Sequence, residues 1–265
     1  MRLKFRTIVL ALVMIGIIPC TAFCAEVSIS VSPIRVEHLT KQGERGTDMF
    51  SVTNDGTAPT RLKVSIEDWN LTKDGTPVFM RAEKSAYSCA EWIRVNPVDF
   101  RINPGQTREV RYTINVPAGI ESGGYRAAIV FETVPDAEPG EKARRVLLRG
   151  RIAAILYEVV GKTPVDGYAT GLKAEVKQEE IDFTLSLKNT GKVHYRTKGS
   201  ITIKDSNGNK ALDVEIPDTP VLQDSEREVR VRCDKSLPKG TYSALASVDI
   251  GRKELVGAET TFVIE

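Results

Sequence analysis

The sequence predicts an all-β protein with two tandem immunoglobulin-like β-sandwich domains. Residues 101–131 and residues 220–250 each contain a turn, an alternating strand built on Arg-Glu-Val-Arg, a Pro, a glycine close to a Tyr, and a second strand. Upstream of these copies, Asn54 and Asn189 lie in similar polar turns. Because the copies are separated by about 120–135 residues, too many for a solenoid, the repeat indicates two domains of similar fold.

The first domain, which we place at residues 26–162, is dominated by apolar and polar residues that alternate with a period of two. Turn signals at residues 54–56, 73–75 and 103–105 separate its strands. Pro33 interrupts the first alternating run, which favours an edge strand that switches or bulges there. About seven strands are expected, the number of an immunoglobulin-like sandwich. They lie at residues 27–31, 48–54, 61–69, 92–95, 109–116, 125–134 and 144–157.

The second domain is expected at residues 163–265, after a Gly- and Pro-containing linker at residues 161–167. Its expected hairpin turn is Ser-Asn-Gly at residues 206–208. Antiparallel sheets in both domains leave one face of each strand free to be polar. The expected strands of this domain lie at residues 172–176, 181–187, 199–204, 213–216, 227–232, 242–250 and 259–264.

Residues 1–25 are expected to form a cleaved secretory signal peptide. Basic residues at positions 2, 4 and 6 precede an unbroken apolar run at residues 8–18, which Pro19 ends. The run is too short to span a bilayer comfortably, and no later segment is long enough, so no integral membrane span is expected. The cleavage sites that satisfy the small-residue rule about equally follow Ala22, Cys24 and Ala25. Of these alternatives, a mature start near Ala25 or Glu26 is favoured.

The cysteines support this picture of an exported chain. Cys20 and Cys24 belong to the leader, and the residues before them suit acylation poorly, so lipoprotein anchoring is not expected. Cys89 and Cys233 lie in different repeats, so neither domain contains its own disulfide. Two separate thiols and one bridge between the domains both remain open.

The net charge excludes one class of partner. The whole chain carries +2, but its leader contains three basic residues and no acidic ones, so the mature chain carries −1. Such a balance gives no reason to expect binding to nucleic acid.

The pattern of reactive residues argues against an enzyme. The only two histidines, His38 and His194, lie in different repeats without neighbouring cysteines or paired carboxylates. The sequence contains no phosphate-binding glycine loop, nucleophile elbow or zinc-protease motif. We therefore expect no catalytic residues, no metal site and no cofactor.

Several short motifs of the first domain occur in the order and spacing of one known family. They are the alternating strand that ends in Arg35, Val52-Thr53-Asn54 with Pro59, residues 92–97, residues 100–105 and residues 146–152. Residues 27–162 therefore resemble the periplasmic pilus-assembly chaperones of the PapD type.

The resemblance implies two working parts. In that family, a cationic pair in the interdomain cleft holds the C-terminal carboxylate of a pilin subunit, and the last strand of the first domain donates alternating apolar side chains to the subunit. Arg35 matches the family's first-strand arginine, but Ala153 stands where the family has its lysine. Arg149 and Arg151 are the candidate substitutes, because they point to the same side of the strand as position 153. The implied donor-strand residues are Val146, Leu148 and Ile152.

The resulting prediction is an exported, periplasmic chaperone-like protein that binds pilin-like or surface-protein subunits by β-strand addition. The resemblance also implies contact with an outer-membrane usher. The second domain resembles the WxL-interacting cell-surface proteins, so the alternative is an adhesion or scaffold module that binds cell-wall polymer or a partner protein. A plainer reading of Arg35, Arg149 and Arg151 is also open, namely solvated charges that protect an exposed strand from aggregation.

Overall fold

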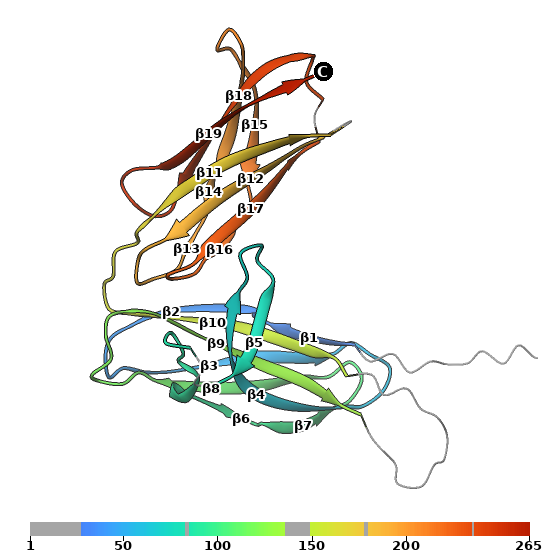
Figure 1. Cartoon of the computed structure of the whole chain (residues 1–265). Helices are drawn as coiled ribbons and strands as arrows, with labels where there is room; N and C mark the ends of the chain where they lie inside the picture. Colours follow the sequence, from blue (N-terminus) through green and yellow to red (C-terminus); the bar gives the residue numbers. More distant parts are fainter. Residues whose placement is uncertain (1–27, 83–84, 136–148, 178–179, 235) are drawn as a thin grey trace, which may run out of the picture.

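The protein consists of two β-sandwiches, and the second stands on one face of the first (Figure 1). The structure is a computed structural model that describes residues 28–82, 85–135, 149–177, 180–234 and 236–265. The predicted all-β fold with two immunoglobulin-like sandwiches is confirmed. The one helix among the described residues is a single 3-10 turn, η1 (Ala90–Trp92). No helix in this part of the chain has the length and hydropathy needed to cross a membrane.

The first sandwich packs a four-stranded sheet against a six-stranded one. The smaller sheet has the order β1-β3-β8-β6, and the larger one has the order β2-β10-β9-β4-β5, with β7 also paired to β4. The smaller sheet contains β1 (Ile29–Ser32), β3 (Arg45–Asn54), β8 (Thr107–Asn115) and β6 (Ile93–Asn96). The larger contains β2 (Arg35–Thr40), β10 (Arg151–Val160), β9 (Gly123–Val134), β4 (Thr60–Leu71), β5 (Pro77–Arg81) and β7 (Asp99–Ile102).

The chain changes sheets at Pro33, as the sequence indicated. The Ser32–Pro33 peptide bond is cis, and it separates β1 in the smaller sheet from β2 in the larger one. Strand β2 then runs parallel to β10, with Arg35 opposite Ile155 and Thr40 opposite Val160. The predicted last strand of this domain began at residue 144, but residues 144–148 lie outside the described residues. The described part of that strand begins at residue 151.

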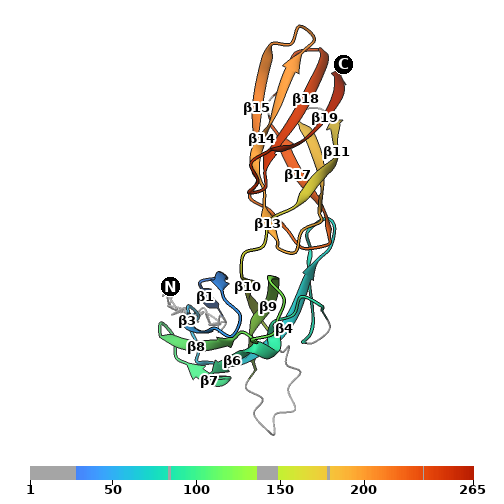
Figure 2. The same ribbon diagram turned by 90° about the vertical axis from the view of Figure 1, so that its left-hand side faces the viewer.

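The second sandwich packs the sheet β11-β12-β17 against the sheet β15-β14-β18-β19, with a short pair β13-β16 (Figure 2). The three-stranded sheet consists of β11 (Gly167–Val176), β12 (Ile181–Asn189) and β17 (Glu226–Cys233). The four-stranded sheet consists of β14 (Lys198–Asp205), β15 (Lys210–Ile216), β18 (Gly240–Asp249) and β19 (Val256–Ile264). The short pair is β13 (Tyr195–Arg196) with β16 (Pro220–Val221). The predicted turn at residues 206–208 joins β14 to β15.

Each sandwich has its own apolar core between its two sheets. Phe50, Tyr112 and Phe131 are among the buried residues of the first, and Phe183 is among those of the second. Cys89 lies in the first core and Cys233 in the second, and both are free thiols. Because burial raises the pKa of the Cys89 thiol well above its usual value, this side chain behaves as a small apolar residue.

The repeat found in the sequence is a repeat of hydrogen bonding. Asn54 is fully buried, and its Nδ2 donates to Ala58 O at 2.8 Å and to Ile102 O at 3.0 Å. Asn189 is also fully buried, and its Nδ2 donates to Val193 O at 2.9 Å and to Val221 O at 3.0 Å. In both turns the backbone N–H two residues later donates to the asparagine Oδ1. Each asparagine therefore joins a turn to a neighbouring strand of its own domain.

A second equivalence concerns two tyrosines near the starts of β9 and β18. Tyr125 Oη donates to Glu121 O at 3.0 Å, and Tyr242 Oη donates to Pro238 O at 2.9 Å. Each of these hydrogen bonds joins the tyrosine to the backbone four residues earlier, in the loop before a central strand. This is the arrangement of a tyrosine corner in sandwich domains. The Gly-Tyr element of the repeat thus marks the same structural position twice.

We predict that Asn54→Ala destabilises the first sandwich by about 2–4 kcal/mol, because it removes the three hydrogen bonds that this fully buried side chain makes. Urea unfolding followed by circular dichroism measures the change. The control is Asn207→Ala in an exposed turn, which we expect to stay within about 0.5 kcal/mol of the wild type. Equal effects of the two substitutions would contradict the assignment.

Candidate functional site

One edge of β10 is open along part of its length. Strand β9 pairs with all of β10, whereas β2 pairs only with residues 155–160. Among the described residues, no strand pairs with residues 151–154 on the β2 side. Ile155 N donates to Ile34 O at 2.9 Å, and backbone groups alternate sides along a strand, so the N–H and C=O groups of residues 151 and 153 face this open side. We call residues 151–154 the open edge.

Arg35 lies where the open edge ends. Its register partner is Ile155, and it is exposed on the outer face of the larger sheet. Arg35 also lines a hollow of about 420 Å³ between the domains, together with Arg196 and Lys198 of the second domain. Arg35 makes no ion pair or hydrogen bond with any described side chain. The hollow therefore contains a guanidinium group that is available to an anionic ligand.

Acidic side chains also line this hollow, and its cations lower the pKa of two of them. Asp218 Oδ1 lies 2.6 Å from Arg196 Nε, and this hydrogen bond, with Arg35 and Lys198 nearby, lowers the pKa of Asp218. Glu37 Oε1 lies 3.4 Å from His194 Nε2, and the hydrogen bond from His194, with help from Arg35 and Arg196, lowers the pKa of Glu37. Both carboxylates are thus stabilised in the charged form; Arg196 is hydrogen-bonded to Asp218, whereas Arg35 acts on both acids through its charge alone.

The three arginines singled out in the sequence do not meet at one point. Arg151 Nη2 lies 2.5 Å from Glu67 Oε1, and Arg149 Nη1 lies 3.3 Å from Glu132 Oε1. Arg151 precedes the partner of Arg35 by four strand positions, which corresponds to about 13 Å along β10. Arg149 and Arg151 form an ion-pair cluster at one end of the open edge, and Arg35 stands at the other end.

The predicted donor residues are only partly within the described chain. Val146 and Leu148 lie outside the described residues, so their role stays a prediction. Ile152 is half-buried and faces the interior of the sandwich, where it lines a hollow of about 270 Å³ with Leu62 and Phe131. Its side chain therefore points to the opposite side of the sheet from Arg151.

The outer face of the larger sheet is apolar where it meets the second domain. Trp69, Ala128, Val130 and Tyr157 form a buried cluster there with Leu222 of the second domain. Further apolar side chains extend this cluster, namely Leu71, Phe79, Ala153 and Ile155. Trp69 thus belongs to neither sandwich core.

The part of this face that Leu222 leaves uncovered is a groove of about 630 Å³. Ala153 and Ile155 of β10 line it on one side, and Trp69 and Phe79 of the β4–β5 hairpin line it on the other. Of the described residues around it, only Arg35 is charged. We call this space the cleft groove; it lies beside the open edge, on the outer face of the same strand.

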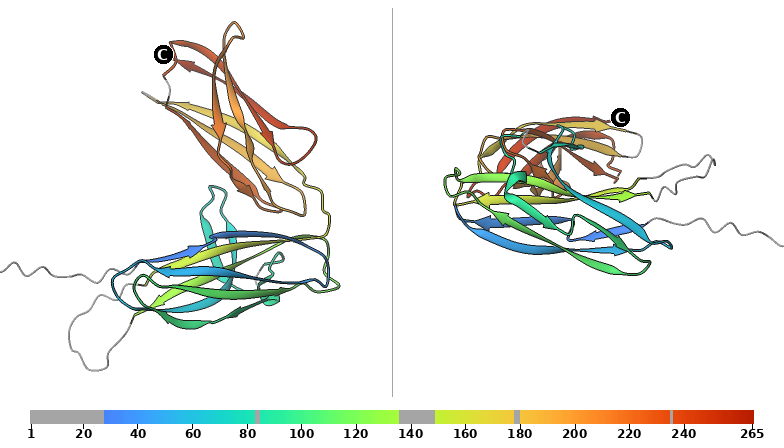
Figure 3. Two further views of the ribbon diagram at one scale, coloured as in Figure 1. Left: turned by 180° about the vertical axis from the view of Figure 1, so that it is seen from behind. Right: turned by 90° about the horizontal axis from the view of Figure 1, so that it is seen from below.

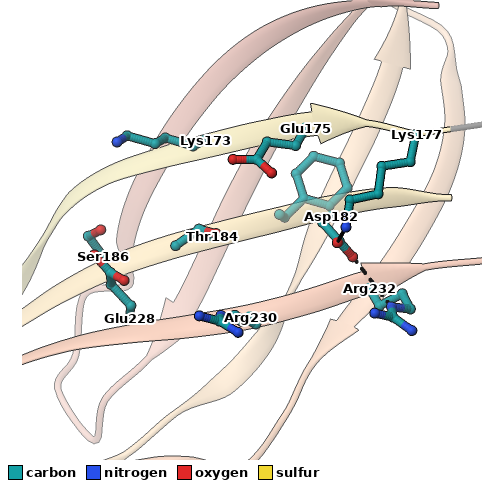
Figure 4. A pocket seen from close by; sticks show the side chains of 10 residues that line it. Lys173, Glu175, Lys177, Asp182, Thr184, Ser186, Glu228, Arg230 and Arg232 are labelled. Carbon is teal, nitrogen blue, oxygen red and sulfur yellow. Dashed lines mark hydrogen bonds and ion pairs between the residues drawn. The ribbon is translucent and has the colours of Figure 1, made fainter. Parts of the chain in front are cut away.

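The second domain shows the outer face that an antiparallel sheet normally has. Figure 4 shows Lys173 and Glu175 on β11, and Lys177 just beyond its end, above a row of polar side chains on β12 and β17. Arg232 Nε lies 3.4 Å from Asp182 Oδ1, and the charges of the two signs alternate across the strands. This face is solvated, as the sequence indicated, whereas the outer face of the larger sheet in the first domain is apolar.

Sequence reasoning missed the apolar outer face and the second-domain cations. The sequence does contain a signal for the apolar outer face. Residues 152–157 of β10 read Ile-Ala-Ala-Ile-Leu-Tyr without alternation, which is typical of a strand buried on both faces. No local signal marks Arg196 or Lys198, because only the docking of the domains brings them to Arg35.

Polar contacts fix the angle at which the domains meet. Arg126 is buried; its Nε donates to Trp69 O at 3.0 Å and its Nη1 donates to Gln223 Oε1 at 3.1 Å. Gln223 Nε2 in turn donates to Gly124 O at 2.6 Å, and Gly124 N donates to Lys192 O at 2.7 Å. A side chain at position 124 would collide with Gln223, because an added Cβ would lie 2.4 Å from its Nε2. The backbones therefore approach as closely as a glycine permits.

The β4–β5 hairpin forms a second contact between the domains. It rises from the first sandwich toward β16 and β17 (Figure 1, Figure 3). At its tip, Lys73 O accepts a hydrogen bond from Glu228 N at 2.7 Å, and Lys73 Nζ lies 3.3 Å from Glu226 Oε2. Tyr87 Oη also donates to Asp224, and this hydrogen bond raises the pKa of Tyr87 to about 12. The hairpin keeps one wall of the cleft groove in place.

A buried carboxylate holds β2 against β10. Glu158 is fully buried; Thr40 Oγ1 donates to its Oε1 at 2.5 Å, and His38 Nδ1 lies 3.3 Å from its Oε2. The hydrogen bond to Glu158 raises the pKa of His38, although partial burial acts in the opposite direction. His38 Nε2 also lies 3.3 Å from Tyr112 Oη of the facing sheet. The contact with Glu158 therefore favours the protonated form of His38, and together with the hydrogen bond from Thr40 it fixes the strand that carries Arg35.

The described residues contain no group of three or more His, Cys, Asp or Glu side chains that could hold a metal ion. The polar groups of the cleft are cations with partly neutralising acids, beside an apolar surface and an unpaired strand edge. In chemical terms, an unpaired strand edge can accept a further strand by backbone hydrogen bonding, and the cations beside it can attract an anionic group.

Comparison with known proteins finds similarity in solved structures. No protein-family model matches the sequence, and no curated protein matches it. Similar solved structures include the chaperone–tip adhesin complex of CFA/I fimbriae, with 12% identity, 90% of this chain and 100% of that chain covered, and a TM-score of 0.49. The YadV chaperone is 12% identical over 88% of this chain and 99% of that chain, with a TM-score of 0.46. The Escherichia coli chaperone DraB is 15% identical over 90% of this chain and 98% of that chain, with a TM-score of 0.43. These are chaperones, the class of protein that the sequence resembles.

We predict that stability contributed by His38 is lost as the pH rises. The folded pKa of His38 is raised above its unfolded value of about 6.5, so the contribution is complete below about pH 6.5 and disappears as the pH passes the folded pKa. Urea unfolding between about pH 5.5 and pH 9 measures this, and the difference from His38→Gln isolates His38 from other groups. The same pH profile in both proteins would contradict the assignment.

We predict that Arg126→Met uncouples the two domains. The substitution leaves Trp69 O and Gln223 Oε1 without the donor that Arg126 provides at a buried interface, which costs about 1–3 kcal/mol of interdomain stabilisation. Calorimetry is expected to show one transition for the wild type and two for the variant. Arg45→Met, at an exposed site on β3, is the matched control and is expected to leave one transition. An unchanged single transition in Arg126→Met would refute the coupling.

Proposed function

We propose that this protein is an exported chaperone that binds an extended segment of a partner subunit by β-strand addition at the open edge. The single observation that carries the proposal is that β10 is paired on one side over residues 151–160 but on the other only over residues 155–160. A partner strand gains the hydrogen bonds that residues 151 and 153 offer. A pilin-like subunit is the partner class that the sequence resemblance implies.

The position of Arg35 sets the direction of the bound strand. The partner occupies the place in the larger sheet that the chain leaves when it crosses to β1 at Pro33. A strand that runs parallel to β10 ends beside Arg35, where its C-terminal carboxylate meets the unpaired guanidinium. Arg196 and Lys198 add positive charge from the second domain. In this proposal they replace Arg149 and Arg151 as the further cations that bind the carboxylate, because both of these arginines form ion pairs with glutamates.

The remaining sequence expectations belong to this proposal. Residues 1–25 direct the chain to the periplasm, and residues 26–162 and 163–265 form the two domains. Val146, Leu148 and Ile152 supply the apolar donor side chains, and an outer-membrane usher is the expected second contact. The donor residues and the usher contact follow from the resemblance of the sequence to PapD-type chaperones, whereas the leader and the domain bounds follow from the sequence pattern itself.

Co-expression with subunits encoded beside this chain tests the proposal. The wild type is expected to give a one-to-one complex on size exclusion, and Arg35→Ala is expected to weaken it about 10–100-fold through loss of the charged contact. Ala153→Pro removes an N–H of the open edge while leaving the pairing with β9, and it is expected to abolish binding. Arg45→Ala, an exposed arginine on β3, is the control. A complex that survives both cleft substitutions would refute strand addition here.

A further inference from the structure

Strand β2 is held in the larger sheet by few contacts. It lies at an edge of that sheet, where the described residues pair it only with β10. Of its six residues only Val36 is buried, and Leu39 is 76% exposed. A strand with one paired edge and one buried side chain opens locally at a low cost in free energy. The polar side chains of β2 therefore contribute a large share of what holds it in place.

Both histidines of the chain contact this strand, one on each of its faces. His38 belongs to β2, and its Nδ1 lies 3.3 Å from Oε2 of its fully buried register partner, Glu158. His194 of the second domain is 7% exposed, and its Nε2 lies 3.4 Å from Glu37 Oε1 on the outer face of β2. A carboxylate neighbour favours the protonated imidazole over the neutral one. The two contacts thus make the attachment of β2 sensitive to protonation.

We propose that β2 is a proton-controlled latch, which is closed on β10 while its histidine contacts are protonated and opens locally as they lose their protons. Arg35 is the first residue of β2 and lines the hollow between the domains, so opening of the strand moves this guanidinium away from its place in the hollow. The latch goes beyond the proposed function, because it requires neither strand addition nor a partner subunit.

The groups around His38 set the direction of the response. Glu158 of β10 faces it inside the sandwich, and Asp48 of β3 adds a second negative charge nearby. Tyr112 Oη of β8 lies 3.3 Å from His38 Nε2, and the two rings are stacked. The hydrogen bond to Glu158 raises the pKa of His38, against the effect of partial burial. The closed strand therefore keeps this proton to a higher pH than the open strand does.

The groups around His194 are of both signs. Its ring stacks on Tyr157 of β10, with the ring centroids 4.0 Å apart, and Glu37 of β2 is its acidic neighbour. Arg35 and Arg196 lie near the same carboxylate, and their charges oppose a further cation on the imidazole. The hydrogen bond from His194 lowers the pKa of Glu37, so this carboxylate is ionised at neutral pH. We therefore assign the main response to the histidine within β2 and a supporting one to His194.

Linkage gives the sign and the size of the effect. Because the pKa of His38 in the closed strand lies above its free value of about 6.5, the latch is fully favoured below about pH 6.5 and is lost as the pH passes the closed-state pKa. Each unit by which the closed-state pKa exceeds the open-state pKa changes the opening equilibrium about tenfold. Opening of β2 is thus expected to become more frequent as the pH rises.

Hydrogen–deuterium exchange of the full chain tests the latch. It is read by mass spectrometry between about pH 6 and pH 9 and corrected for the intrinsic pH dependence of exchange. Over this range, opening of residues 35–40 is expected to increase about 5–20-fold more than opening of residues 123–134 in β9, the central reference strand of the same sheet. His38→Gln is expected to remove most of this difference, and His194→Gln is expected to reduce it.

Two outcomes of this experiment would overturn the proposal. An equal change in β2 and β9 would mean that His38 acts on the stability of the whole domain and that no separate latch exists. A pH-dependent difference that His38→Gln leaves intact would mean that other groups control the strand.

A covalent lock provides an independent variant. Leu39 of β2 and Val159 of β10 are register partners, so Leu39→Cys combined with Val159→Cys places two thiols across the pair. The oxidised variant is expected to lose the pH-dependent opening, and the reduced variant is expected to keep it. Opening that persists in the oxidised variant would refute the latch. No partner takes part in these measurements, so failure of the latch and failure of the proposed function are separate results.

Discussion

The burial of β9 and β10 on both faces is the constraint on which the rest of the molecule depends. Residues such as Phe131 and Leu156 point into the sandwich core, while Val130 and Tyr157 point to the opposite face. An outer face of this kind is unstable in water, since each large apolar side chain costs about 1.5–3 kcal/mol when exposed. The second domain covers part of it with Leu222, and the hairpin that carries Trp69 narrows the remainder to a groove. Domain docking and the candidate site are therefore two consequences of one apolar surface.

The crossing of the chain at Pro33 creates the other half of the site. Had the first strand stayed in one sheet, it would have covered β10 along its whole length. Because β1 joins the smaller sheet and β2 the larger one, the hydrogen-bonding groups of residues 151 and 153 remain open beside Arg35. An unpaired strand edge promotes aggregation, and charged side chains beside it reduce this tendency. The ion pair of Arg151 with Glu67 places such charges beside the open edge.

Buried polar groups keep these surfaces in a fixed position relative to one another. Arg126 joins the backbone of β4 to Gln223 of the second domain, so the cationic hollow keeps its shape. Glu158 performs a similar task within the first domain, because Thr40 and His38 bind it from the strand that carries Arg35. Such groups are costly to bury and costly to leave unpaired, so each favours a single arrangement of its neighbours. The arrangement that they specify places Arg35 at the end of the open edge.

The sequence by itself determined the all-β class, the two sandwiches and the equivalence of Asn54 with Asn189, because alternation and turn chemistry act over a few residues. It also identified Pro33 as a point of strand switching and Arg35 as a candidate ligand-binding residue. Only the tertiary structure decided that Arg149 and Arg151 pair with acids and that Arg196 joins Arg35 from the other domain. The apolar outer face of β10 was not predicted, although the unalternating stretch at residues 152–157 is typical of a strand buried on both faces. Those outcomes depend on how two separately folded domains dock, and docking is set by complementary surfaces far apart in the chain, which no local pattern encodes.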